Sequence, residues 1–164
     1  MKRNLILTVA ALMATSLTTL WAAKPSQSEI QQALAEVKTK IENRDYTISV
    51  KNATPLRGGS IATENTLLVV DGDQASSSLP YWGSGYNSFN NDEGMRFQGQ
   101  ISDYKVTEHK KNRLLATFKV TAQTGRIYQI KLEVFYNGST FISTTCTNLD
   151  PMRYMGQLRV SGID

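Results

Sequence analysis

The sequence predicts a mainly β domain of the α+β class, an antiparallel β-sandwich or partly open β-barrel of about eight strands with one N-terminal amphipathic helix. Three observations predict it. Apolar residues recur at helical spacing over about residues 26–43, and from Tyr46 onward they alternate or form short runs. Turn dipeptides such as Asp71-Gly72 and Asn137-Gly138 separate these runs. Periodicity alone does not distinguish a sandwich from a barrel.

Residues 1–22 have the pattern of a secretory signal peptide. Lys2 and Arg3 precede an apolar run over residues 5–20, which threonines and serines interrupt. The positive start and the apolar core favour export, and the polar interruptions argue against a permanent membrane span. We expect cleavage after Ala22, with Ala23 as the second choice and a retained amphipathic anchor as the alternative. The mature chain, residues 23–164, is then periplasmic or secreted.

The composition of the mature chain excludes several function classes. Loss of Lys2 and Arg3 lowers the net charge from +4 to about +2. A charge this small argues against a nucleic-acid-binding face. Cys146 is the only cysteine, so no intramolecular disulfide forms, and no cysteine near the cleavage site signals a lipid anchor. About 142 residues are enough for one domain with its own core.

The helix begins at a recognisable N-terminal cap. Ser26 can cap it, and Glu29 stands at the spacing of a capping box. An apolar stripe follows at helical spacing, which must be buried against the sheet. Its members are Ile30, Leu34, Val37 and Ile41.

The strands follow in order after the helix. The first alternates, the second is an apolar run that turns at Asp71-Gly72, and a weaker segment then leads to Leu79, where Pro80 ends pairing. The predicted strands cover residues 46–50, 66–70, 95–99, 101–107, 113–122, 127–136 and 139–147.

Asn137-Gly138 predicts the register of the last of these hairpins. A two-residue type I′ turn there pairs Tyr136 with Ser139. In that register one face of the hairpin is the core face and the other is polar. The core face contains Tyr128, Ile130, Leu132, Val134 and Phe141, and the polar face contains Gln129, Lys131, Glu133, Ile142 and Cys146, with Cys146 opposite Gln129.

The sequence offers little catalytic or metal-binding chemistry. His109 is the only histidine and lies in the basic run 109–113, which we interpret as a solvated hairpin tip. The acidic pairs 71/73 and 92/93 lack the ligand spacing of a calcium loop, and the glycines at 83, 85, 94 and 99 fit no nucleotide motif. We therefore predict no catalytic residue, metal or cofactor. The alternative is a glycan-directed hydrolase with converging carboxylates such as Asp92, Glu93 and Asp103.

The segment LPYWGSGYNSF, residues 79–89, is the candidate site. Its aromatic residues either fold back onto the core as a structural corner or form a platform on which a sugar ring or a partner surface stacks. The platform would be rimmed by the polar residues 90–92. The candidate ligand-binding residues are Tyr81, Trp82, Tyr86, Asn87 and Phe89, with Tyr154 from a later segment.

Two segments together resemble an exported bacterial family known as domain of unknown function 4251, best known from Bacteroides-type bacteria. They are LPYWGSGYNSFNNDEGMRFQG (79–99) and FYNGSTFISTTCTNLDPMRYMGQL (135–158). The resemblance implies a periplasmic or outer-membrane-associated β-rich domain without an assigned activity. Many relatives look like lipoproteins, whereas this chain has no cysteine after its signal peptide. We also expect Tyr154 and Gly156 to pack beside Tyr81 and Tyr86.

These patterns predict an exported cell-envelope protein, a non-enzymatic β domain that binds a ligand or partner. The expected partner is a glycan or an envelope protein. The alternatives are the hydrolase and a purely structural envelope component.

Overall fold

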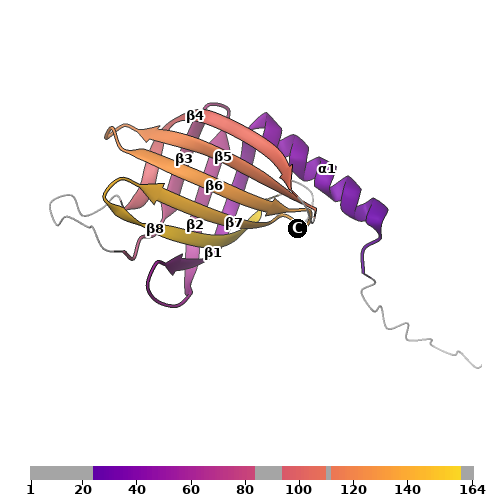
Figure 1. The fold of residues 1–164 in the computed structure, drawn as a ribbon, viewed down its shortest axis with the longest axis horizontal. Coiled ribbons are helices and arrows are strands. Elements are labelled where there is room, and N and C mark those ends of the chain that lie inside the picture. Colours follow the sequence, from indigo (N-terminus) through magenta and orange to yellow (C-terminus); the bar gives the residue numbers. More distant parts are fainter. Residues whose placement is uncertain (1–23, 84–93, 110–111, 160–164) are drawn as a thin grey trace, which may run out of the picture.

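The computed structural model describes residues 24–83, 94–109 and 112–159, which form one helix and a closed antiparallel β-barrel. Eight strands follow one another around the barrel in chain order, and the helix lies at one end (Figure 1). The elements are α1 (Gln27–Asn43), β1 (Asp45–Pro55), β2 (Ile61–Asp71), β3 (Gln74–Leu79), β4 (Met95–His109), β5 (Arg113–Ala122), β6 (Ile127–Phe135), β7 (Ser139–Cys146) and β8 (Leu149–Leu158).

Pairing between the first and last strands closes the barrel. β1 pairs with β8 from Ile48 opposite Leu158 to Pro55 opposite Met152. Of the two predicted architectures the barrel is the one observed, and it is complete rather than partly open. The short strand β3 pairs with only part of each neighbour, from Leu68 to Asp71 of β2 and from Met95 to Gln100 of β4.

The barrel has two different ends. We call the end near α1 the helix end and the opposite end the loop end (Figure 1). Among the described residues, the helix end holds the connections around residues 44, 72–73, 112 and 136–138, and the loop end holds those around residues 56–60, 80–83, 94, 123–126 and 147–148.

Helix α1 covers the helix end. The predicted capping box is present, because the Glu29 amide donates to Ser26 Oγ at 3.3 Å and the Ser26 amide donates to Glu29 Oε2 at 2.6 Å. Val37 and Ile41 are buried, and Tyr104 Oη donates to the Ile41 carbonyl at 2.6 Å, which fixes the last turn on β4. Within the described part of the chain, no helix has the length and apolarity needed to cross a membrane.

Apolar side chains from alternate strand positions fill the barrel. The largest ones are completely buried, as the small diameter of an eight-stranded barrel allows. Three threonines also lie inside, and each donates its hydroxyl to a backbone carbonyl. The buried residues include Ile48, Leu68, Leu114, Leu132, Ile142, Thr66, Thr140 and Thr144.

The register predicted for the β6–β7 hairpin is wrong by one residue. The Gly138 amide donates to the Phe135 carbonyl at 2.9 Å, and Gly138 has a φ of +78°. These features define a three-residue loop with glycine in the left-handed position, so Asn137-Gly138 does not form the two-residue turn. Leu132 pairs with Ile142 as a result, and Glu133 pairs with Phe141.

This shift exchanges the two faces of β7, because side chains alternate along a strand. Phe141, expected in the core, is 47% exposed, while Ile142 is completely buried. Cys146 lies opposite Tyr128 rather than Gln129 and is buried. Burial raises the pKa of the Cys146 thiol.

Candidate functional site

The chain leaves β3 at Leu79 and turns across the loop end of the barrel. The Pro80 carbonyl accepts a hydrogen bond from Tyr154 Oη at 2.8 Å, and Tyr81 Oη accepts one from the Asp150 amide at 2.9 Å. Both donors belong to β8, which lies three strands from β3 around the barrel. Residues 80–81 therefore form a structural corner that ties opposite walls together.

The Tyr81 ring occupies the space between two glycines. A Cβ atom on Gly83 would overlap the end of the ring, and one on Gly94 would lie 2.7 Å from Tyr81 Cβ. Gly94 also has a φ of +39°, and its carbonyl accepts a hydrogen bond from Tyr128 Oη at 3.3 Å. Both ends of the connection from β3 to β4 are thus packed on one tyrosine, and the two positions require glycine.

Trp82 projects from this corner. Its side chain is 42% exposed, whereas Tyr81 beside it is partly buried and packs against the core. The other predicted platform residues, Tyr86, Asn87 and Phe89, lie outside the described residues, as does the polar rim at 90–92. The described part of the candidate surface is therefore Trp82 on a fixed support.

Tyr154 supports the corner from inside the barrel. It is only 1% exposed, so Tyr154, predicted as a ligand-binding residue, does not belong to the candidate contact surface. Burial raises the pKa of Tyr154, which keeps the hydroxyl protonated as the donor to Pro80. Tyr154 packs beside the corner, as the sequence predicted. Gly156 lies against β1 instead, since a Cβ there would be 2.5 Å from the Ser49 carbonyl oxygen.

The carboxylates named for a hydrolase do not form a described pair. Asp103 lies on the outer wall of β4, where its Oδ2 atom is 2.8 Å from Lys119 Nζ. The hydrogen bond to this ammonium group lowers the pKa of Asp103. Asp92 and Glu93 lie outside the described residues. Among the residues that are described, no three His, Cys, Asp or Glu side chains come together as a potential metal site.

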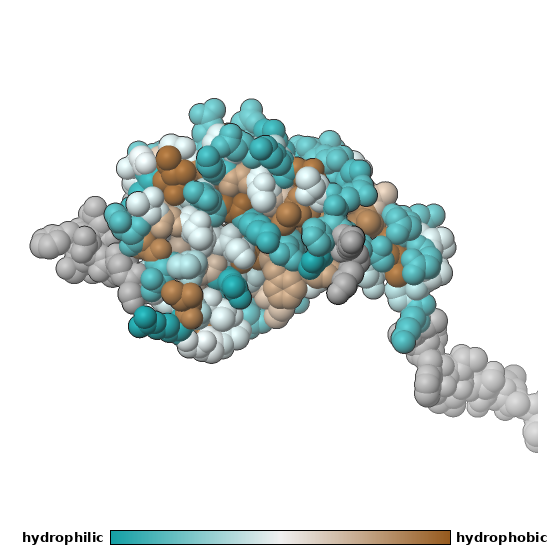
Figure 2. Space-filling model, in the orientation of Figure 1, coloured by the Kyte–Doolittle hydropathy of each residue, from teal (hydrophilic) through white to brown (hydrophobic). Residues whose placement is uncertain are grey.

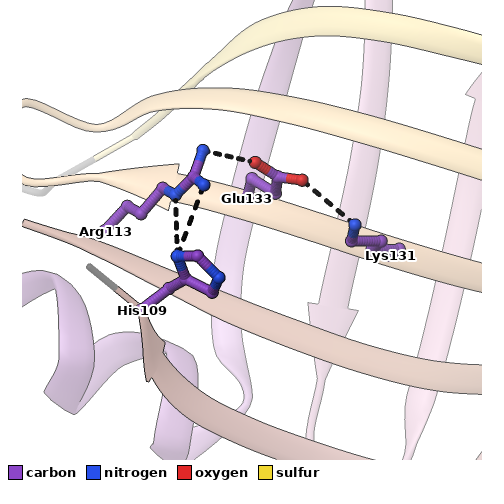
Figure 3. A network of polar contacts seen from close by, with 4 residues as sticks. All are labelled: His109, Arg113, Lys131 and Glu133. Atoms are coloured by element: carbon purple, nitrogen blue, oxygen red, sulfur yellow. Dashed lines mark hydrogen bonds and ion pairs between the residues drawn. The ribbon is translucent and has the colours of Figure 1, made fainter. Parts of the chain in front are cut away.

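His109 belongs to a polar network on the outer wall (Figure 3). Its Nδ1 atom accepts hydrogen bonds from Arg113 Nε at 3.4 Å and Nη2 at 3.3 Å. Arg113 Nη1 donates to Glu133 Oε2 at 2.9 Å, and Glu133 Oε1 is 3.1 Å from Lys131 Nζ. The sequence indicated that Lys131 and Glu133 share a face. It missed Arg113 as their neighbour, which requires the pairing of β5 with β6.

Comparison with known proteins supports the fold and identifies the family. A crystal structure at 1.95 Å of a DUF4251 family protein from Bacteroides eggerthii DSM 20697 matches with a TM-score of 0.60 and 16% identity, over 80% of this chain and 87% of that one. A search of functionally curated proteins gave no match. The profile of DUF4251, a domain of unknown function, matches residues 28–158, from α1 to the end of β8. The chain therefore belongs to the DUF4251 family.

Proposed function

We propose that this chain is a non-enzymatic binding domain of the bacterial cell envelope, which contacts a ligand or partner through Trp82 at the loop end. One observation carries the proposal. Trp82 is 42% exposed although the backbone before it is bonded to β8 and the glycine after it packs on Tyr81. A large aromatic side chain stays accessible on a support that is already ordered.

An exposed tryptophan on a fixed support is well suited to binding. Its ring offers a broad apolar face with one polar N–H group, the combination that stacks against a sugar ring or an apolar partner side chain. Because the corner is ordered before the ligand arrives, binding costs less conformational entropy than on a free loop. A glycan or an envelope protein is the expected partner.

Two residues considered for catalysis in the sequence have other contacts. His109 and Asp103 lie on the outer wall and contact cationic side chains. Export is part of the proposal, with residues 1–22 as the signal peptide. Protein sequencing of the chain from a periplasmic fraction tests it, and we expect the mature protein to start at Ala23.

Trp82 fluorescence tests the binding surface directly, because signal-peptide removal leaves Trp82 as the only tryptophan. We expect red-shifted emission that acrylamide quenches easily, and a saturable change when the matching glycan is added. Blue-shifted, protected emission would mean that Trp82 is covered, and would overturn the proposed surface.

Calorimetry on two variants completes the test. Trp82→Ala should abolish ligand binding without changing the thermal midpoint. The matched control is Phe141→Ala, which removes an aromatic side chain of similar exposure (47%) from the barrel wall and should bind like the wild type. Equal binding by wild type and Trp82→Ala would exclude the corner as the contact surface.

A further inference from the structure

A small cavity opens on the outer wall beside the His109–Arg113 network. Its volume is about 130 Å³, and it lies at the helix end of β4, β5 and β6, away from the Trp82 corner. This space holds several water molecules but is too small to enclose a nucleotide or an oligosaccharide. The lining residues are His109, Arg113, Leu114, Leu115, Lys131 and Glu133.

The cavity has an excess of positive charge and of hydrogen-bond donors. Glu133 is its only carboxylate, and it bonds Arg113 through Oε2 and Lys131 through Oε1. One negative charge is therefore shared between two positive ones. Arg113 carries five N–H groups and Lys131 three, so each keeps donors that this network does not use.

Arg113 is held in position before any ligand binds. His109 and Glu133 fix its guanidinium group by hydrogen bonds, and the guanidinium carbon lies 6.0 Å from the centre of the Phe135 ring. The side chains of Arg113 and Glu133 are only 27% and 29% exposed, so salt screens their charges less than those of free surface residues. A planar guanidinium group with fixed orientation suits the two oxygens of an oxyanion.

His109 adds a further donor. Because its Nδ1 atom accepts hydrogen bonds from Arg113, the ring proton of the neutral imidazole belongs on Nε2. The hydrogen-bond donors at the cavity are therefore one imidazole, one guanidinium and one ammonium group, whose side chains Figure 3 shows around Glu133.

From this geometry we infer a small-oxyanion site, for a phosphate or carboxylate group, formed by His109, Arg113 and Lys131. Glu133 is a positioning residue that sets the places of the two cations, and its charge limits the affinity. A metal cation does not fit, because the single carboxylate is already bonded to two cationic groups. The site is independent of the loop end, so its failure leaves the proposal for Trp82 untouched.

His109 provides the probe, because it is the only histidine of the chain and gives one set of ring resonances. The protein is titrated with inorganic phosphate, acetate and chloride at constant pH and ionic strength. We expect saturable shifts of the His109 resonances with phosphate or acetate, and the tighter of the two identifies the oxyanion. Linear shifts, or the same shifts with chloride, would overturn the site.

Three charge variants separate specific binding from a general surface effect. Lys131→Gln should weaken oxyanion binding roughly ten- to hundredfold, the loss expected for a hydrogen bond to a charged group. Lys119→Gln is the matched control, because Lys119 has similar exposure (46% against 50%) and its own carboxylate partner, Asp103. It should bind like the wild type, and equal weakening in both lysine variants would refute the site.

Glu133→Gln should change the oxyanion affinity in the opposite direction to Lys131→Gln. It removes the competing negative charge while keeping a side chain of the same size, so the oxyanion should bind more tightly than in the wild type. A network with a purely structural role predicts no gain. Unchanged or lost binding in a folded Glu133→Gln variant would contradict the inference.

Discussion

Removal of one buried hydroxyl should test how the corner at the loop end is held. Tyr154→Phe keeps the ring, which is 1% exposed and fills the barrel, but deletes the hydrogen bond of 2.8 Å from Oη to the Pro80 carbonyl. The barrel should therefore remain packed while the corner loses its attachment to β8. The hydrogen bond from the Asp150 amide to Tyr81 Oη is a second link on that side, which the substitution leaves in place.

The expected loss of stability follows from the burial of this hydrogen bond. A neutral hydrogen bond contributes about 1 kcal/mol net, and a carbonyl left without its partner costs about 1–3 kcal/mol when no water replaces it. Pro80 is only partly buried, so water can reach its carbonyl in part. We expect Tyr154→Phe to lower the free energy of unfolding by about 1–2 kcal/mol and the thermal midpoint by about 3–6 °C.

Urea denaturation followed by circular dichroism and by Trp82 emission measures this loss. The midpoint should fall at an unchanged m value, because the surface exposed on unfolding stays the same. Tyr136→Phe is the control, since in the described part of the chain the Tyr136 hydroxyl has no hydrogen-bond partner. If the two variants are equally stable, the bond from Tyr154 does not hold the corner.

Three further experiments test the packing of the barrel and the start of helix α1. Gly156→Ala should destabilise the protein by about 1–3 kcal/mol in thermal unfolding, because the new Cβ would lie 2.5 Å from a carbonyl oxygen of β1. Gly59→Ala is its control and should be nearly neutral, because a Cβ there meets no atom within 4 Å. Ser26→Ala should cost about 1 kcal/mol and speed amide exchange in the first turn of α1. Cys146 should react slowly with a thiol reagent at pH 8 in the folded protein and quickly in urea, because burial raises its pKa. The folded state then holds the thiol proton more tightly than the unfolded state, so the Cys146 contribution to stability should fall as the pH rises above about 8.5.

Local patterns predicted the elements better than their pairing. The capping box at Ser26 and the stripe ending at Ile41 identified α1, because both depend only on residues close in the chain. The register predicted for β6 and β7 was wrong because Asn137-Gly138, the usual signal of a two-residue turn, also fits a three-residue loop with glycine in the left-handed position. In the closed barrel the three-residue loop places Ile142 in the core and Phe141 on the outer face. On the outer face of the barrel, Phe141 lies opposite Met155 of β8 and packs against Phe135, with the ring centres 6.0 Å apart.

The two interpretations of the aromatic segment each describe a different part of it. Tyr81 belongs to a structural corner, since its hydroxyl bonds to β8 and its ring fills the space between two glycines. Trp82, the next residue, is the exposed ring that a binding platform requires. The sequence could not separate them, because the bonds that fix residues 80 and 81 come from Asp150 and Tyr154, about 70 positions later.

Buried side chains restrict access to the barrel interior in the described part of the chain. In an eight-stranded barrel the side chains can occupy the whole interior, and here they include Phe118, Leu132 and Tyr154, all nearly or completely buried. α1 covers one end with Val37 and Ile41, and the corner at residues 80–81 crosses the other. A ligand that entered the interior would have to displace this packing, whereas the Trp82 corner and the Arg113 cavity are accessible from outside. Variants of these two outer regions should therefore change binding without unfolding the barrel, and variants of the interior should do the reverse.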